Sequence, residues 1–439
     1  MQMPAQADLR HSLTSVPSLA SSGTLKRQAV AVSAFKPNIA FNRGNLRNRP
    51  RPSPASPTID FIEIRQDTLP GPLEELVEST DDLWISPFQC HSWLDSWRLA
   101  QSGGFPCRPV TAIGYCGNKI AFILPLAVFK RYGARCLSWY AYQISDYCAP
   151  VVNLHCIEAF TQCRGDDLLR QIARSIGGID LIYIPKQLQS VSGHPNPFVT
   201  GDAFPYHAGA HAISFQPGET WKATLARRRS AKTRGRLNSK RNALEKLGHV
   251  GFHLAATCED ARMLIGTCLS AKSEQLGKAG HWDPFSPPGI REHLINYFSS
   301  RVGQSTWVAT FEIDGQPLAT AFGFRDERNW LLYQMAMTCG PNARYSPGTH
   351  LLMELMKHCI GLGVSRLDLA LGDESYKAEW CDENSKLMVS TIGITTKGAI
   401  LARVIRLRAH LRKYFSSNPK LYDRAKWVKG MAKRLWLPV

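Results

Sequence analysis

The sequence lacks several features that would place it quickly in a common class. Its twelve cysteines form no Cys-x-x-Cys pair, and no Cys/His spacing typical of a zinc site occurs. The longest nearly apolar run, Ile120 to Phe129, has about ten residues, whereas a membrane-spanning helix needs about 20. The N-terminus has no apolar stretch of the kind found in secretory signals, and a Gly-x-Ser-x-Gly motif is missing. We therefore expect a cytoplasmic protein with reduced, buried thiols and no bound metal.

Acidic residues are scarce at both ends of the chain but not in its middle. Residues 1–58 hold eight Lys/Arg and one acid, and residues 397–439 hold twelve Lys/Arg and one acid. These two segments account for the whole net charge of +18, so residues 59–396 are neutral. The basic charge therefore does not make the folded body a nucleic-acid binder, and we expect nucleic acid not to be a partner.

Composition and pattern divide the chain into five segments. Residues 1–57, rich in Ser, Pro, Asn and Arg, predict a disordered basic tail, although such a start also fits an organellar transit peptide. The sequence pattern predicts the same order of elements in residues 58–215 and in residues 249–396. That order is a strand, helices, three antiparallel strands, a helix and a strand. A basic helical connector over 216–248 joins these two lobes, and a basic segment follows over 397–439. The element order predicts an α+β fold in which one pattern occurs twice.

Within the first lobe, strands are predicted over 109–115, 119–129 and 135–142. Gly117-Asn118 between the first two is typical of a hairpin turn. The aromatic run from Trp139 to Tyr142 is most simply part of the third core strand.

The C-terminal segment contains a basic amphipathic helix over 399–415. Ile400, Val404, Leu407 and Leu411 share one of its faces. Such a helix can pack on its own domain, or it can dock on anionic lipid at the inner face of a membrane. We expect packing and leave the peripheral membrane contact open.

A loop before a predicted helix in the second lobe has the features of a phosphate site. Ser346 suits the N-cap and Pro347 the first helical position. Gly348 and Thr349 would then present backbone N–H groups at the positive end of the helix dipole, with Arg344 beside them. A capped core helix without a ligand is the alternative interpretation.

Acids, a phenol and an amine follow the next predicted strand. Asp368 lies in that strand, and Asp373, Glu374, Tyr376 and Lys377 come directly after it. This grouping suits an acid–base site, although Asp373 can equally be the N-cap of a solvated turn.

Two motifs in this region resemble a known family. They are Tyr345-Ser-Pro-Gly-Thr-His-Leu-Leu352 and Gly372-Asp-Glu-Ser-Tyr-Lys-Ala-Glu-Trp380. Both are similar to the CelD-type acetyltransferases of bacteria, which are GNAT-superfamily proteins associated with cellulose and exopolysaccharide loci and related to the FemABX transferases. The resemblance covers roughly residues 59–396 and implies tandem GNAT-like lobes with mixed, mostly antiparallel sheets, of which the second is catalytic.

The resemblance also implies roles for the motif residues. Acetyl-CoA, or another acyl-CoA, would place its pyrophosphate at residues 346–349, near Arg344. The acceptor amine would attack the thioester directly, with Asp373 or Glu374 as base and Tyr376 as proton donor to the leaving thiolate. Lys377 and Asp368 would contact the acceptor.

These observations predict an acyltransferase that moves an acetyl group from acyl-CoA to an amine or hydroxyl. The resemblance alone implies that the acceptor is a small molecule or a glycan precursor of polysaccharide or envelope metabolism. One alternative is a FemABX-like aminoacyltransferase that uses charged tRNA, in which the stretch 227–246 would bind RNA phosphates. The other is a non-catalytic, membrane-associated scaffold that binds through its basic ends.

Overall fold

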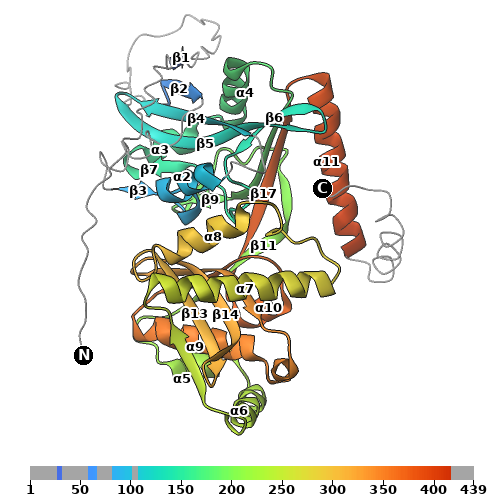
Figure 1. The fold of residues 1–439 in the computed structure, drawn as a ribbon. Coiled ribbons are helices and arrows are strands. Elements are labelled where there is room, and N and C mark those ends of the chain that lie inside the picture. The colour runs from blue at the N-terminus through green and yellow to red at the C-terminus, as the bar shows by residue number, and fades with distance from the viewer. Residues whose placement is uncertain (1–26, 32–57, 67–81, 101–106, 417–439) are drawn as a thin grey trace, which may run out of the picture.

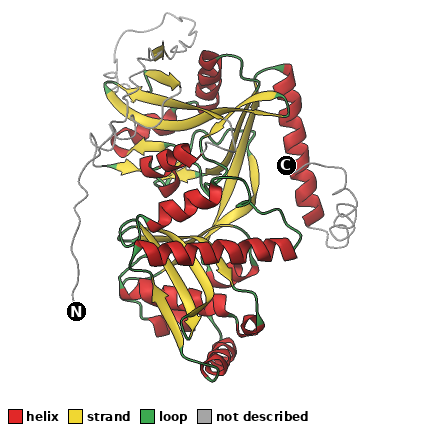
Figure 2. Ribbon diagram, in the orientation of Figure 1, coloured by secondary structure: helices red, strands yellow, loops and turns green. Residues whose placement is uncertain are grey.

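One continuous β-sheet runs through both halves of the protein (Figure 1). The computed structural model describes residues 27–31, 58–66, 82–100 and 107–416. Within these residues the sheet has 15 strands, and helices pack along it (Figure 2). The predicted α+β class is therefore confirmed.

The two halves build their parts of the sheet in the same way. In each, a meander of antiparallel strands is followed by a helical crossover and a strand parallel to the last meander strand. The first half uses β2 (Phe61–Gln66), β4 (Cys107–Cys116), β5 (Lys119–Arg131), β6 (Ala134–Trp139) and the parallel β8 (Leu181–Leu188). The second half uses β12 (Val250–Leu254), β13 (Thr306–Ile313), β14 (Gln316–Arg325), β15 (Asn329–Met337) and the parallel β16 (Arg366–Leu371). The predicted repeat of pattern is confirmed.

The halves exchange their last strands. β11 (Phe204–Ser214), from the first half, pairs with β16, and β17 (Glu383–Gly393), from the second half, pairs with β8. β11 and β17 also pair with each other, so the strand order at the junction is β8-β17-β11-β16. Each half therefore completes the sheet of the other, and neither can leave without breaking backbone hydrogen bonds.

The remaining elements are helices and short strands. The α-helices are α2 (His91–Ala100), α3 (Ile157–Gln162), α4 (Gly165–Ile176), α5 (Trp221–Arg228), α6 (Ala231–Glu245), α7 (Cys258–Lys278), α8 (Ile290–Ser299), α9 (Pro347–Gly361), α10 (Ser375–Trp380) and α11 (Thr396–Ser416). The short elements are the strands β1 (Arg27–Ala31), β3 (Leu83–Trp84), β7 (Val151–Asn153), β9 (Ser190–Val191) and β10 (His194–Pro195), and the 3-10 helices η1 (Pro87–Gln89), η3 (Leu154–Cys156) and η4 (Pro341–Tyr345).

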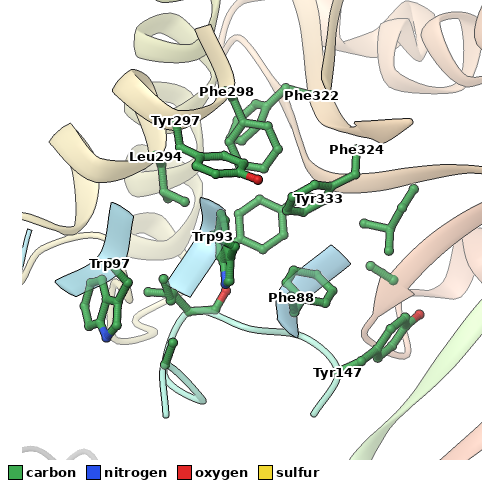
Figure 3. Close-up of a cluster of buried hydrophobic side chains, with 14 of the residues drawn as sticks. Phe88, Trp93, Trp97, Tyr147, Leu294, Tyr297, Phe298, Phe322, Phe324 and Tyr333 are labelled. Atoms are coloured by element: carbon green, nitrogen blue, oxygen red, sulfur yellow. The ribbon is translucent and has the colours of Figure 1, made fainter. Parts of the chain in front are cut away.

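A buried aromatic cluster fills the contact between the halves (Figure 3). Phe88 and Trp93 come from the first half, and Phe298, Phe324 and Tyr333 come from the second. The ring of Phe324 meets those of Phe88 and Trp93 edge-on, with centroids 5.2 and 5.3 Å apart. Edge-to-face pairs add about 0.5–1.5 kcal/mol each beyond the burial of their area. The cluster therefore fixes the halves against each other.

The third strand of the first half is shorter than predicted. β6 ends at Trp139, and Ala141 has a φ of 58°, which is incompatible with a strand. The Lys186 ammonium holds the turn that follows, because it donates to the carbonyl oxygens of Tyr142 (3.0 Å) and Ser145 (2.7 Å). The aromatic run is therefore not one core strand, and residues 140–148 turn toward the second half instead.

Two further predictions are refined by the structure. The basic connector comprises two helices, because Arg229 is extended and the Ser230 hydroxyl caps the start of α6 by accepting from the Thr233 N–H. The prediction of disorder throughout residues 1–57 is wrong at β1, which pairs antiparallel with β2. The backbone edge of β2 gives this segment hydrogen-bond partners that its composition does not reveal. The other residues of 1–57 lie outside the described part of the chain.

Candidate active site

Strands β15 and β16 part toward their C-terminal ends. Among the described residues their parallel ladder consists of three pairs, Asn329–Arg366, Trp330–Leu367 and Leu331–Asp368. Beyond these, β15 stays with β14 and β16 stays with β11. β16 also bends, because Ala370 has a φ of 57° and Gly372 a φ of 133°. A left-handed alanine costs about 1–2 kcal/mol, so its surroundings must hold this bend in place.

Helix α9 begins close to the end of β15. A Cβ atom at Gly348 would lie 3.0 Å from the Met337 sulfur, so glycine permits the close approach of the helix to the strand. Pro347 occupies the first helical position, as predicted. Ser346 has a φ of 60°, and its side chain does not cap the helix. Ser346 is the N-cap residue, as predicted, but its hydroxyl accepts from the Lys240 ammonium at 2.7 Å and from no backbone N–H of the helix.

Positive charge gathers at this helix N-terminus. Lys240 comes from α6, and the exposed Arg344 comes from η4, directly before the helix. The Arg344 guanidinium lies over the Tyr345 ring and donates to its hydroxyl at 2.8 Å. The Thr349 N–H donates to the Ser346 carbonyl within the first turn. Two cations at the positive end of a 15-residue helix make a site suited to an anion such as phosphate.

Residues 140–148 of the first half lie against the parted strands. The Tyr333 hydroxyl, on β15, donates to the Ile144 carbonyl at 2.8 Å. The Tyr147 hydroxyl donates to the Asp368 carboxylate, on β16, at 2.6 Å. Tyr333 and Tyr147 are both buried in the core between the halves. The first half therefore supplies one wall of the region where β15 and β16 separate.

Asp146 lies in the middle of this segment. Its carboxylate accepts a backbone hydrogen bond from Leu371, at the end of β16. Burial raises its pKa to about 6, and the nearby ammonium groups of Lys186 and Lys377 limit the rise. A carboxylate with this pKa is ionised at neutral pH and is more basic than an ordinary aspartate, which suits a general base.

The sequence of the second half matches a known family. Residues 231–378 match the family described as "Acetyltransferase (GNAT) domain". The matched stretch runs from α6 into α10. The protein accordingly has the GNAT fold, with mixed sheets and flanking helices, and the CelD-type branch in particular is not confirmed by any comparison. A search of curated proteins finds no match.

Several solved structures are similar to this chain. They include FemX (TM-score 0.48, 10% identity, 77% of this chain and 99% of that chain covered). L-PGS from Bacillus licheniformis gives a TM-score of 0.41 at 10% identity, with 76% and 96% covered. A tandem GNAT protein from the clavulanic acid biosynthesis pathway gives 0.37 at 12% identity, with 73% and 93% covered.

The two residues predicted to bind the acceptor are held by the protein itself. The buried Asp368 carboxylate accepts from Arg366 (2.8 Å), the Ala370 N–H (2.7 Å) and the Tyr147 hydroxyl. The buried Lys377 ammonium donates to the Ala370 and Leu371 carbonyls and pairs with Glu374 at 3.1 Å. Because an ammonium has three donors, these contacts occupy all of Lys377. The geometry therefore favours positioning roles, in which both residues hold the bend of β16.

The predicted acidic residues point to different partners. Asp373 accepts from the Gly209 N–H (3.0 Å) and contacts His211 Nε2 (2.9 Å), both on β11. Burial would raise the pKa of Asp373, but these hydrogen bonds outweigh burial and lower it below its ordinary value. The Glu374 side chain is 48% exposed and pairs with Lys377. Asp373 is therefore a weaker base than Asp146.

Tyr376 packs against the core on the α9 side of the second half, whereas Tyr147 and Tyr333 belong to the core on the other side. Burial, followed by the Glu374 and Cys381 charges, raises its pKa far above the ordinary value of a phenol. Such a phenol gives up its proton reluctantly, so its predicted part in protonating a thiolate is chemically weak.

Sequence reasoning missed the contribution of the first half. Asp146, Tyr147 and Lys186 reach the site only because the halves share one sheet. The one local signal is a polar Ser145-Asp146 pair that follows the aromatic run and interrupts any strand pattern. His211 was likewise hidden in a strand that carries no motif, and Lys240 was considered only as part of the stretch 227–246 that could bind RNA. No group of side chains suited to a metal ion occurs in the described ranges.

Proposed function

We propose that this protein transfers an acyl group, acetyl in the first instance, from acyl-CoA to an amine or hydroxyl acceptor. The observation that carries the proposal is the basic N-terminus of α9, which lies at the end of the parted strands of a GNAT domain. Gly348 lets the helix start come close to β15, and Lys240 and Arg344 add charge there. These residues fit the pyrophosphate of CoA, which would supply the acyl thioester.

Asp146 is the base in this proposal. It would accept the proton that the acceptor nitrogen or oxygen loses as it attacks the acyl carbon. Its partners support this role, because Lys186 and Lys377 stabilise the ionised carboxylate that must be present before the reaction. Asp373, Glu374 and Tyr376 remain proposed residues of the acceptor side. The sequence resemblance to exopolysaccharide-associated acetyltransferases points to a glycan precursor as acceptor.

The contacts of the basic connector bear on the tRNA-dependent alternative. Arg227 and Arg228 pair with Asp382, and Arg229 pairs with Glu379 while lying over the Trp380 ring. Arg241 pairs with Glu245 and Glu354. These guanidinium groups hold the connector on the GNAT domain. These internal pairs reduce the charge that the connector offers to RNA phosphates, whereas Lys232, Arg236 and Lys246 are exposed on it.

Native mass spectrometry of the full chain separates the three functions. With acetyl-CoA we expect one bound equivalent, and acetyl transfer to amino-sugar or amine acceptors should release free thiol. Lys240→Gln should weaken CoA binding, whereas Lys232→Gln, which changes an exposed lysine on the same helix, should not. Binding of aminoacyl-tRNA without CoA would support the aminoacyltransferase, and binding of neither would support the scaffold.

A further inference from the structure

Helix α11 has two apolar faces, and the sheet covers only one of them. Its inner face contributes the buried Ala402 and the half-buried Leu401 and Ile405, which pack with Ala134 and Leu181 of the first half. The helix lies along the edge of the molecule beside β17 (Figure 1). The Arg406 guanidinium fastens it further by donating to Thr391 and Asp202. The prediction that this helix packs on its own protein is therefore confirmed for this face.

The outer face carries a row of exposed apolar side chains. They are Ile400 (58% exposed), Val404 (54%), Leu407 (60%), Leu411 (46%) and Tyr414 (58%). At about 100° per residue, these five lie within about 80° of the helix circumference and opposite the inner face. A helix that needed only to pack on the sheet would carry polar residues here. The row accounts for nearly half of the large exposed apolar residues in the described chain.

Positive charge flanks this row on both sides. On the helical wheel, Arg403 and His410 fall to one side of the row, and Arg408 and Arg412 fall to the other. All four residues are exposed, and none of the three arginines forms an ion pair with a described carboxylate. The helix contains no Asp or Glu, and the whole of 397–439 has one acid against twelve Lys/Arg. The row is therefore bordered by cations that no described carboxylate neutralises.

We propose that the outer face of α11 docks on an anionic lipid bilayer, with the row from Ile400 to Tyr414 entering the boundary of headgroups and acyl chains. Leucine and tyrosine side chains would gain apolar contacts there, while the flanking arginines would reach lipid phosphates. The helix would lie in the plane of the surface, and no described helix of this chain is long and apolar enough to cross a membrane. The sheet behind α11 would hold the protein at a fixed orientation.

Charge decides between a bilayer and a second copy of this chain. The apolar residues follow a 4-3-4-3 spacing, which also suits a helix pair. A paired α11 would bring Arg403 and Arg408 against the same cations of its partner, with no acid on either helix to balance them. Helix pairs of this kind normally depend on opposite charges beside the apolar seam. An anionic surface supplies the missing negative charge.

Co-sedimentation of the full-length protein with vesicles tests the proposal. Vesicles of phosphatidylcholine and phosphatidylglycerol should bind the protein, and vesicles of phosphatidylcholine alone should bind it weakly. The double variant Leu407→Ser, Leu411→Ser should lower the partition coefficient on the mixed vesicles at least about tenfold. A matched control, Leu247→Ser with Leu362→Ser, removes two leucines of similar exposure from the second half and should leave binding unchanged.

A second double variant, in two arginines of the same helix, keeps the test independent of folding. Arg403→Gln with Arg408→Gln should weaken binding to the mixed vesicles and leave the circular dichroism spectrum and melting temperature unchanged. The proposal is overturned if the leucine variant binds as the wild type does, because the basic termini would then be responsible. It is also overturned if sedimentation equilibrium shows a dimer that the leucine variant dissociates.

Discussion

The hydroxyl of Tyr147 donates a 2.6 Å hydrogen bond to the carboxylate of Asp368, and 221 positions of sequence separate the two residues. The bond joins the first half of the chain to the strand that ends at the proposed site. It also places Asp146, the neighbour of Tyr147, beside the bend of β16. The geometry of the site therefore depends on both lobes, although the family match covers residues of the second alone.

Removing this bond should destabilise the protein. Tyr147→Phe leaves a buried carboxylate with one donor fewer, and hydrogen bonds to charged groups contribute about 1.5–3 kcal/mol. We expect the free energy of unfolding in urea to fall by about that amount. As a control, Tyr132→Phe removes the hydroxyl of a tyrosine that is 59% exposed. This variant should change the free energy of unfolding by less than about 0.5 kcal/mol. Equal stability of the two variants would show that the bond contributes nothing.

Asp146 should determine the pH dependence of the reaction. The carboxylate acts as a base only when ionised, and its pKa is about 6, so kcat/KM should rise as the pH increases through 6 and level off above it. Asp146→Asn should lower kcat by about 10²–10⁴ at pH 8 and abolish this inflection. Binding of acetyl-CoA by calorimetry should survive. An Asp146→Asn enzyme that keeps the wild-type profile would remove Asp146 from the mechanism.

The same carboxyl should leave a signature in stability. Folding raises its pKa from 3.8 to about 6, so the folded state binds this proton more tightly than the unfolded state does. The Asp146 carboxyl therefore contributes its full stabilisation of the folded state at a pH below the unfolded pKa of 3.8. This stabilisation is lost as the pH rises through the folded pKa of about 6. We expect Asp146→Asn to gain stability relative to the wild type between pH 4 and pH 6, measured by urea unfolding across that range. A difference that is constant with pH would contradict the raised pKa.

Gly348 should be critical for cofactor binding. Gly348→Glu brings a side chain against Met337 and a negative charge to the N-terminus of α9. The affinity for CoA should fall at least about tenfold, which corresponds to about 1.4 kcal/mol. Gly361→Glu adds the same charge at the other end of the same helix, where nothing lies within 4 Å of a new Cβ, and should leave CoA affinity unchanged. Equal affinities for the two variants would place the cofactor elsewhere.

Tyr376 distinguishes the sequence-based mechanism from the one that the structure favours. If the phenol protonates the leaving thiolate, Tyr376→Phe should lower kcat by about 10² or more. Its burial and raised pKa lead us to expect a loss smaller than about tenfold, with thiol release as the readout. The Asp146→Asn variant, assayed in parallel, shows how large the loss of kcat is when a residue that accepts a proton is removed.

Local patterns in the sequence were sufficient for most of the elements and for the start of α9. The alternation and the turn residues around Gly117 predicted the first meander, because hairpin turns need the positive φ value that Gly117 adopts. Pro347 predicted the start of α9, because the fixed φ of proline suits the first helical position whatever surrounds it. Interactions of this kind involve neighbours along the chain, so they are visible without a fold.

Only the tertiary structure decided which residues meet at the site. Asp146 acquires its raised pKa from burial against β16, while Lys186 and Lys377, from parts of the chain that no sequence pattern connects to it, limit the rise. The sequence of 399–415 determined an amphipathic helix, but only its packing on the sheet showed that a second apolar face stays exposed. Charge, spacing and propensity belong to the sequence alone. Burial and the neighbours of a titratable group arise when distant strands share one sheet, and they therefore belong to the fold.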